Sequence, residues 1–209
     1  MKKIILIIFL SSFYAFAQDE NTQKQSPSGG YASREVRFMS NVRASFIKPS
    51  SVGDNFLNKG NEGKLGLGLR FGIFKVYDLM MGVGGELLYY DTTDPAYGGD
   101  TDNILINSAF FEIMYKVDIT DKLSIYPKLA PGYTMLNYRK TGDNGSQEGL
   151  RIGAGAFIDY KLTRVIAIFI GGEYSHTQLR VATNSAYKDF FGEVGQLNFS
   201  GGVKFTIKD

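Results

Sequence analysis

The chain has 209 residues, which allows one domain with a sizeable interior and leaves little room for two. It contains no cysteine, so neither a disulfide nor a lipid anchor on an N-terminal cysteine is available. Its 23 basic and 21 acidic residues nearly balance, which argues against nucleic acid as a partner because affinity for phosphate backbones depends on an excess of clustered positive charge.

Residues 1–17 have the pattern of a cleaved export signal. Two lysines follow the initial Met, residues 4–10 form an unbroken apolar run, and Ala15-Phe16-Ala17 supplies small residues at a cleavage site. The alternative is a membrane anchor, but the run is shorter than the roughly 20 apolar residues that a spanning helix needs. We expect cleavage before Gln18, which leaves 21 basic residues against 21 acidic ones.

Residues 18–35 are polar and rich in Gln, Ser, Pro and Gly, and contain too few apolar side chains to offset the entropy of ordering them. They predict a flexible periplasmic segment. Residues 36–209 are expected to form the folded domain.

Eight segments of that domain alternate apolar with polar or small residues, which is the pattern of β-strands with two unlike faces. In chain order they are residues 36–47, 64–73, 79–90, 104–117, 123–138, 150–162, 165–178 and 196–207. Each reaches the roughly 9–11 residues that a tilted strand needs to cross a membrane. The pattern predicts an all-β, eight-stranded antiparallel up-and-down barrel that spans a membrane.

The predicted connections alternate in length. Short turns fall near residues 75–78, 118–122 and 163–164, and long polar loops at residues 48–63, 91–103, 139–149 and 179–193. Outer-membrane barrels have short periplasmic turns and longer external loops. Pro127 and Pro131 interrupt the fifth strand, and because a closed barrel has no edge strand we expect a bulge or an early strand end there.

Alternation alone does not decide whether the apolar faces meet lipid outside or a captured ligand inside. Balanced charges beside glycines on the polar faces favour a narrow lumen filled with side chains. Aromatic residues near both ends of the strands, Phe38, Tyr77, Tyr115, Tyr160 and Phe205 at one end and Phe46, Tyr89, Tyr133 and Tyr174 at the other, favour two interfacial girdles.

If lipid lies outside, the polar faces must hold paired charges in the lumen, because an unpaired charge in a confined interior is costly. The residues expected to form these structural ion pairs are Arg43, Arg70, Glu86, Glu112, Lys128, Arg151, Asp159, Glu173 and Lys204. Glu112 and Lys128 are equidistant from Thr120, so a hairpin centred there predicts that they lie side by side. The alternative is that these charges form a solvated outer face.

The end of the chain has the spacing of the signal by which the barrel-assembly machinery recognises its clients: a polar residue, a glycine, an aromatic and a hydrophobic residue at Ser200, Gly202, Phe205 and Ile207. It departs from the commonest form because Lys208 and Asp209 follow where a terminal Phe is usual. With these features the chain resembles the small eight-stranded outer-membrane barrels typified by the membrane domain of OmpA and by OmpX, in a Bacteroidetes-type, porin-family form. The resemblance implies a Gram-negative outer-membrane location, outer-membrane lipid and the assembly machinery as partners, and no particular reaction.

Catalytic and metal-binding constellations are poorly represented. His176 is the only histidine, and no spacing selects Ser175, Ser185 or Asp189 as its partners. A calcium site at Asp91, Asp94, Asp100 and Asp102 is less expected than a solvated loop, because their spacing does not fit an EF-hand. We therefore expect no cofactor and no metal.

Three functional hypotheses remain. The first is a non-enzymatic outer-membrane barrel with a filled lumen, which acts structurally or binds through its external loops or docks with an envelope protein partner. The second is a secreted soluble barrel that carries an apolar ligand. The third is a barrel enzyme that modifies lipid.

Overall fold

The structure is a computed structural model that describes residues 36–98, 101–140, 143–181 and 184–208. Every described residue lies in the unit Arg34–Asp209. The predicted signal peptide and the predicted periplasmic segment, residues 1–35, fall outside the described residues.

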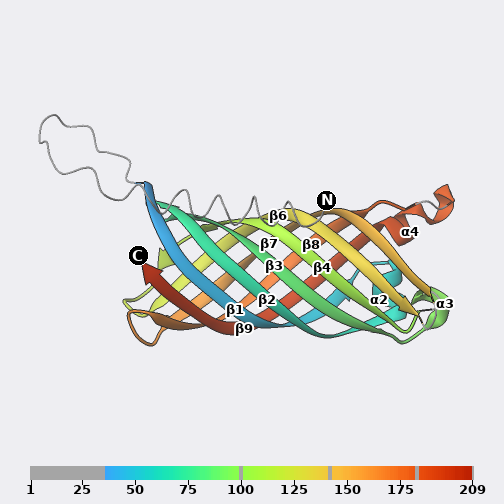
Figure 1. The fold of residues 1–209 in the computed structure, drawn as a ribbon, viewed down its shortest axis with the longest axis horizontal. Coiled ribbons are helices and arrows are strands. Elements are labelled where there is room, and N and C mark those ends of the chain that lie inside the picture. The colour runs from blue at the N-terminus through green and yellow to red at the C-terminus, as the bar shows by residue number, and fades with distance from the viewer. Residues whose placement is uncertain (1–35, 99–100, 141–142, 182–183, 209) are drawn as a thin grey trace, which may run out of the picture. The chain divides into compact units, whose positions relative to one another are not determined.

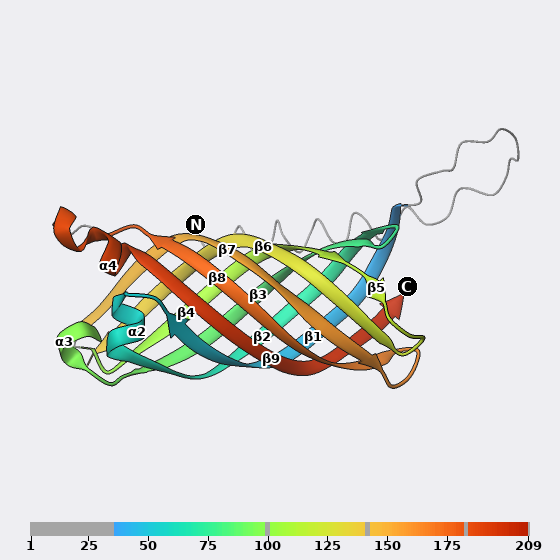
Figure 2. The same cartoon turned by 180° about the vertical axis from the view of Figure 1, so that it is seen from behind.

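The described residues form a closed antiparallel β-barrel (Figures 1 and 2). The strands are β1 (Val36–Val52), β2 (Asn61–Val76), β3 (Leu79–Thr92), β4 (Asn103–Tyr115), β5 (Val117–Asp118), β6 (Leu123–Lys140), β7 (Asp143–Lys161), β8 (Ile166–Leu179) and β9 (Glu193–Lys208). Apart from β4 and β5, which do not pair with each other, strands that are neighbours in sequence pair, and β1 pairs with β9 to close the barrel. Because β4 and the short β5 both pair with β6, they occupy one position in the wall, and the eight predicted strands are confirmed.

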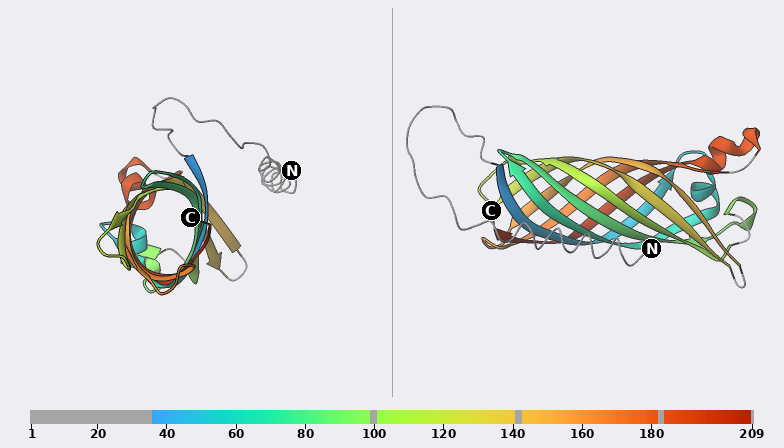
Figure 3. Two further views of the ribbon diagram at one scale, coloured as in Figure 1. Left: turned by 90° about the vertical axis from the view of Figure 1, so that its left-hand side faces the viewer. Right: turned by 45° about the horizontal axis from the view of Figure 1, so that its top comes forward.

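Short helices gather at one end of the barrel and tight turns at the other (Figure 3). The helical segments are α2 (Phe56–Gly60), α3 (Pro95–Gly98), η1 (Ser185–Tyr187) and α4 (Lys188–Gly192). In outer-membrane barrels the end with the short turns faces the periplasm, so the helices lie at the external end. No helix among the described residues is long and apolar enough to span a membrane.

The side chains alternate between the two sides of the wall. Leu67, Ile158 and Phe199 face outward and are 51%, 40% and 55% exposed, whereas the charged faces of the same strands are buried. The apolar sides therefore meet lipid, and the soluble barrel that holds a ligand against its apolar faces is excluded by this orientation.

The hairpin between β6 and β7 is longer than the sequence indicated. Residues 143–149, expected in a long polar loop, continue β7 and pair with β6 as far as Lys140 opposite Asp143. Polar cross-strand contacts stabilise this extension; the Tyr138 hydroxyl donates to Gln147 Oε1 at 2.8 Å. A strand that projects beyond the membrane has no side facing lipid, so its sequence lacks the alternation of apolar and polar residues. These residues therefore have the composition of a loop.

The expected bulge or early end at Pro127 and Pro131 is wrong. Both prolines lie within the continuous strand β6, and both pair in register with β7. The irregularity lies in the neighbouring strand instead: pairing of β6 with β4 skips the positions between Gly132 and Leu129, and β4 ends at Tyr115. Because proline has no N–H to donate, the ladder between β4 and β6 is interrupted opposite Pro131, while β6 itself continues.

A charge in the lipid-facing wall tests this orientation. Leu69 lies midway along the outward face of β2, and Leu69→Arg is expected to lower the free energy of unfolding by about 2–4 kcal/mol, because a guanidinium at the middle of the bilayer is poorly solvated. The matched control is Gln178→Arg at the external end of β8, where the cost falls to about 0–1 kcal/mol. Denaturant unfolding in lipid vesicles measures both. Equal effects at the two positions would contradict the proposed depth of Leu69.

Candidate functional site

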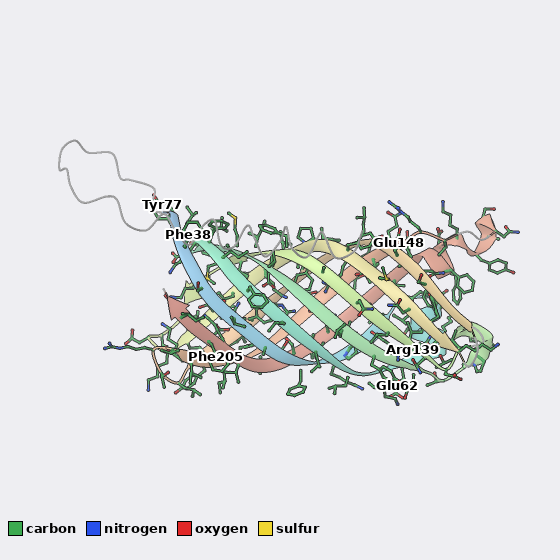
Figure 4. All side chains as sticks on the ribbon, viewed as in Figure 1. Phe38, Glu62, Tyr77, Arg139, Glu148 and Phe205 are labelled. Carbon is green, nitrogen blue, oxygen red and sulfur yellow. The ribbon has the colours of Figure 1, made fainter. Side chains whose placement is uncertain are left out.

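The outward face carries a band of apolar side chains, with aromatic residues at its border near the turn end and charged residues at its border near the helical end. Figure 4 shows Phe38 and Tyr77 at the turn end of the barrel, with Glu62, Arg139 and Glu148 toward the helical end. All nine aromatic residues predicted to form the girdles are exposed on this outer surface. The wall thus has the aromatic and charged borders of a membrane-spanning barrel.

Inside the barrel, a closed ring of six charged side chains crosses the lumen. Every cation bridges two carboxylates and every carboxylate bridges two cations. In order around the ring the residues are Arg70, Glu86, Arg151, Glu173, Lys128 and Glu112, one each from β2, β3, β7, β8, β6 and β4. We call these six residues the charge ring. All are at least 95% buried, and their formal charges cancel.

The contacts of the charge ring are short. Nitrogen–oxygen separations are 3.2 Å for Arg151 to Glu86, 3.0 Å for Lys128 to Glu112 and 3.4 Å for Arg70 Nε to Glu112. The last is an ion pair without hydrogen-bond geometry, whereas Glu86 with Arg70, and Glu173 with both Lys128 and Arg151, are joined by direct hydrogen bonds. Two partners for each charge offset the cost of taking six ions out of water.

A second cluster lies beside Phe157, toward the turn end. Arg43 and Lys204 both donate to Oδ2 of Asp159, at 2.9 and 3.0 Å, and Lys204 also donates to the Tyr126 hydroxyl at 3.2 Å. Two cations share one carboxylate, so this trio, unlike the charge ring, has a surplus positive charge. We call Arg43, Asp159 and Lys204 the turn-end cluster.

Aromatic rings separate and support the two charged groups. The centroid of the Phe157 ring lies 4.2 Å from Lys128 Nζ and 5.0 Å from the Arg43 guanidinium. The centroid of the Phe110 ring lies 4.9 Å from the guanidinium of Arg151. Cations over ring faces gain electrostatic attraction that needs no further hydrogen bond, which suits a lumen with limited polar surface.

Inward-facing glycines make room for the charge ring. A Cβ on Gly153 would lie 2.7 Å from Glu173 Oε1, and one on Gly84 would lie 2.5 Å from the Phe110 ring. The glycines that share the polar faces with charges in the sequence are therefore sites of close packing.

An apolar cluster closes the external end of the lumen. It contains Ile47, Phe56, Leu57, Leu88, Tyr90, Ile104, Ile106, Leu136, Leu179 and Val194, with Tyr138, Val181, Phe190 and Phe191 packed against it. We call this set the external plug. Phe56 and Leu57 belong to α2, which Asn55 caps by accepting from Asn58 N at 2.9 Å and donating to Val52 O at 2.8 Å.

The structure places all nine predicted lumen residues inside the barrel and in ion pairs. Glu112 and Lys128 are 3.0 Å apart, although the predicted register was wrong by two residues: Lys128 lies opposite Met114. The pair survives because diagonal neighbours on one face of a sheet remain within reach of long side chains.

The external plug was missed by the sequence reasoning, and a signal for it was present. Alternation fails at the external ends of β3 and β4, where residues 87–90 and 104–106 are apolar on both faces. Such runs mark strands buried on both sides, here by lipid and by the plug.

The residues considered for catalysis do not assemble. Ser175 faces the lumen and is completely buried, whereas His176 faces the outer side of the same strand, so the wall separates them. Ser185 lies in η1 and Asp189 in α4, beyond the wall.

The aspartates considered for calcium do not converge either. Asp94 accepts from Ala96 N at 2.9 Å at the start of α3, and Asp91 is 3.8 Å from Lys64, while Asp100 is outside the described residues. No group of three or more His, Cys, Asp or Glu side chains in the described ranges is arranged to hold a metal ion.

The residues of the candidate assembly signal lie on β9, the strand that closes the barrel against β1. Phe205 and Ile207 are exposed on the outer surface at the turn end of the barrel. Recognition of this strand by the assembly machinery stays a prediction.

The charge ring makes a prediction about stability. Arg151→Met removes the cation between Glu86 and Glu173 and leaves buried negative charge without compensation, so the free energy of unfolding should fall by about 3–5 kcal/mol. The control is Arg180→Met, which breaks an exposed pair with Glu148 and should cost no more than about 1 kcal/mol. Denaturant unfolding in vesicles compares the two, and similar midpoints would show that the ring contributes little.

The external plug also makes a prediction about stability. Phe56→Ala should lower the free energy of unfolding by about 3–5 kcal/mol, since it leaves a cavity where the ring packs against Tyr138 and Phe191. Hydrogen exchange in residues 53–60 should accelerate, while sugar uptake by proteoliposomes stays at the level of empty liposomes because the charge ring still crosses the lumen. The exposed Tyr187→Ala serves as the control and should change stability by less than about 0.5 kcal/mol. Rapid sugar uptake by the Phe56→Ala barrel would show that the charge ring alone does not block the lumen.

Comparison with known proteins agrees with this architecture. The family model described as "Outer membrane protein beta-barrel domain" matches residues 5–205. No curated protein matches the chain.

Several solved structures share the fold. Neisserial surface protein A (NspA) is 16% identical with a TM-score of 0.59, and the alignment covers 83% of this chain and 99% of that one. A major outer membrane protein from Thermus thermophilus is 13% identical with a TM-score of 0.52, covering 81% and 99%. OprG from Pseudomonas aeruginosa is 12% identical with a TM-score of 0.50, covering 82% and 97%.

These identities are low, so the likeness to solved structures concerns the fold, whereas the family model covers most of the chain. Wall, girdles and lumen are those of a barrel in the outer membrane of a Gram-negative envelope. The chain belongs to the family of outer membrane proteins that share this β-barrel domain.

Proposed function

We propose that the protein is a non-enzymatic outer-membrane barrel that conducts no solute and acts through a folded external surface on which an envelope protein partner docks. The observation that carries this proposal is the packing of three external connections into one body over a lumen that the charge ring and the external plug fill with side chains. We call α2, α3 and α4 together the external cap.

Aromatic contacts join the helices of the external cap. The Phe56 ring in α2 lies 5.9 Å from Phe191 in α4, and the Tyr97 ring in α3 lies 6.4 Å from Phe190 in α4. Lys59 of α2 lies near the last two rings: its Nζ is 5.7 Å from the centroid of the Tyr97 ring and 5.9 Å from that of Phe190. Helices from three separate loops therefore hold one another in place.

Polar contacts add to this packing. Asp54 pairs with Lys59 at 2.6 Å, and this hydrogen bond raises the pKa of Lys59, so the lysine stays charged at physiological pH. The backbone N–H groups of Thr93 and Asp94 donate to the Gly60 carbonyl. A Cβ on Gly60 would lie 2.1 Å from Gly98 N, so α2 and α3 approach as closely as they do only because Gly60 is a glycine.

The external cap exposes tyrosines beyond the membrane. Tyr97 and Tyr187, which immediately precedes α4, are 45% and 58% exposed. Tyrosine contributes a large contact area at low entropic cost and is enriched where proteins bind one another. A preorganised surface of this kind loses little freedom on binding, which supports recognition as the role of the cap.

The filled lumen supports the same role. The charge ring and the external plug both cross the lumen, and an eight-stranded barrel leaves room for little besides side chains. A non-enzymatic role is supported by the separation of Ser175 from His176 across the wall.

Site-specific photocrosslinking in intact cells tests docking. A photoreactive amino acid at Tyr97 or Tyr187 should yield a discrete adduct, and the same residue at Ile170, which faces lipid, should not. Excess purified barrel in nanodiscs should compete the adduct away, and a Tyr97→Ala/Tyr187→Ala barrel should compete at least about tenfold less well, as expected when interface tyrosines are truncated. An adduct of equal yield at Ile170, or equal competition by both barrels, would refute the proposal.

A further inference from the structure

The apolar outer surface of the barrel continues past the aromatic border near the turn end. Leu162, which immediately follows β7, takes the next outward position after Tyr160, and on β9 Ile207 follows Phe205 in the same way. Leu162 and Ile207 are 55% and 75% exposed. Residues beyond an aromatic girdle leave the hydrocarbon region, so large apolar side chains at these positions indicate a further contact.

The β5–β6 turn repeats this arrangement. Ile119 comes two residues after Val117, which is exposed on the outer surface. The backbone N–H of Ile119 donates to the carbonyl of Leu123 at 2.9 Å, and Leu123 lies opposite the outward Tyr160. Because residues opposite each other on paired strands share a face, Ile119 lies on the outer side of the wall. It is 52% exposed.

The β2–β3 turn has an aromatic residue at a strained position. Tyr77 is the first of the two residues that join β2 to β3, and its φ is +56°, in the left-handed region that glycine usually fills in such turns. Tyr77 is 66% exposed, so little of it packs against the described part of the chain. A contact outside the chain accounts for a tyrosine at such a position.

These four residues are spread around the whole barrel. In the order of the strands in the wall, Tyr77 lies between β2 and β3, Ile119 after β5, Leu162 after β7 and Ile207 on β9, and Figure 4 shows Tyr77 at the turn end. We call these four residues the apolar rim. The rim is continuous with the surface that already faces lipid, and lipid surrounds a barrel on every side, whereas a protein docked beside it covers one side. The occupant that fits is lipid of the inner leaflet.

Two of the turns have backbones suited to leaving water. In the β7–β8 turn the N–H groups of Leu162 and Thr163 both donate to the Ile166 carbonyl, and the Thr163 hydroxyl accepts from the N–H groups of Val165 and Ile166. The β5–β6 turn has the same four hydrogen bonds, with Thr120 in the place of Thr163. Backbone groups in lipid have to be satisfied within the protein, and these turns meet that condition for four N–H groups each.

We propose that the apolar rim inserts into the inner leaflet of the outer membrane, so that the turns at this end lie within the lipid interface instead of projecting into the periplasm. Tyr77 then contributes its ring to the acyl chains and its hydroxyl to the headgroups. Ile119, Leu162 and Ile207 extend the contact with the acyl chains. The external end differs, because β6, β7 and the external cap continue beyond the membrane, so the rim sets the depth of the barrel.

Spin labelling in nanodiscs of palmitoyl-oleoyl phosphatidylcholine tests the proposal. The chain has no cysteine, so a single introduced cysteine carries the nitroxide. The rim variants are Ile119→Cys and Leu162→Cys, and the references are Ile170→Cys in the lipid-facing wall and Tyr187→Cys beside α4. Power saturation compares collisions with oxygen, which concentrates in hydrocarbon, with collisions with a water-soluble nickel complex. We expect both rim ratios to lie closer to that of Ile170. A ratio closer to that of Tyr187 at either rim position overturns the proposal.

Bilayer thickness provides a second measurement. Ile119→Ser/Leu162→Ser shortens the apolar height of the barrel, so its free energy of unfolding should be largest in vesicles with shorter acyl chains than for the unchanged barrel. The matched control is Lys122→Ser/Arg164→Ser, which truncates exposed polar residues of the same two turns and should leave the optimum chain length unchanged. Heat-modifiable migration verifies that both double variants fold. An unshifted optimum in the rim variant, or an equal shift in both variants, contradicts insertion.

Discussion

Charge neutralisation in a confined interior is the constraint on which the rest of this structure depends. Lipid on the outside requires every outward position between the girdles to be apolar or small, so the polar half of each strand has to face inward. Eight strands enclose too little space for bulk water, and inward charges must satisfy one another. The charge ring solves this problem for six residues with no net charge, and Gly84 and Gly153 leave the space that it needs.

The two ends of the lumen differ in chemistry. Toward the outside the filling is apolar, and α2 contributes Phe56 and Leu57 to it, so the seal and the external cap are made from the same segment. Toward the periplasm the filling becomes cationic, and Asn41 and Lys204 lie at the edge of an open cavity. The charge ring lies between these two kinds of surroundings.

The sequence predicted the wall well because a barrel wall is governed by a period of two, and the facing of residues such as Leu67 and Arg70 follows once lipid is placed outside. It predicted which charges enter the lumen for the same reason. It did not predict the order of the charge ring, because a contact such as Arg151 with Glu86 joins strands that are not neighbours and depends on the curvature of the closed sheet. The extension of β7 before Gly149 was also missed, since outside the membrane polar strands and loops have similar compositions.

The charge ring draws one residue from each of six different strands, and two of them, Arg151 on β7 and Glu86 on β3, meet only when the sheet curves round the lumen. A half-zipped sheet entering the bilayer would carry bare guanidinium and carboxylate groups that only water could solvate. We expect the interior to lose its last water only after the strands that carry Arg151 and Glu86 have come together.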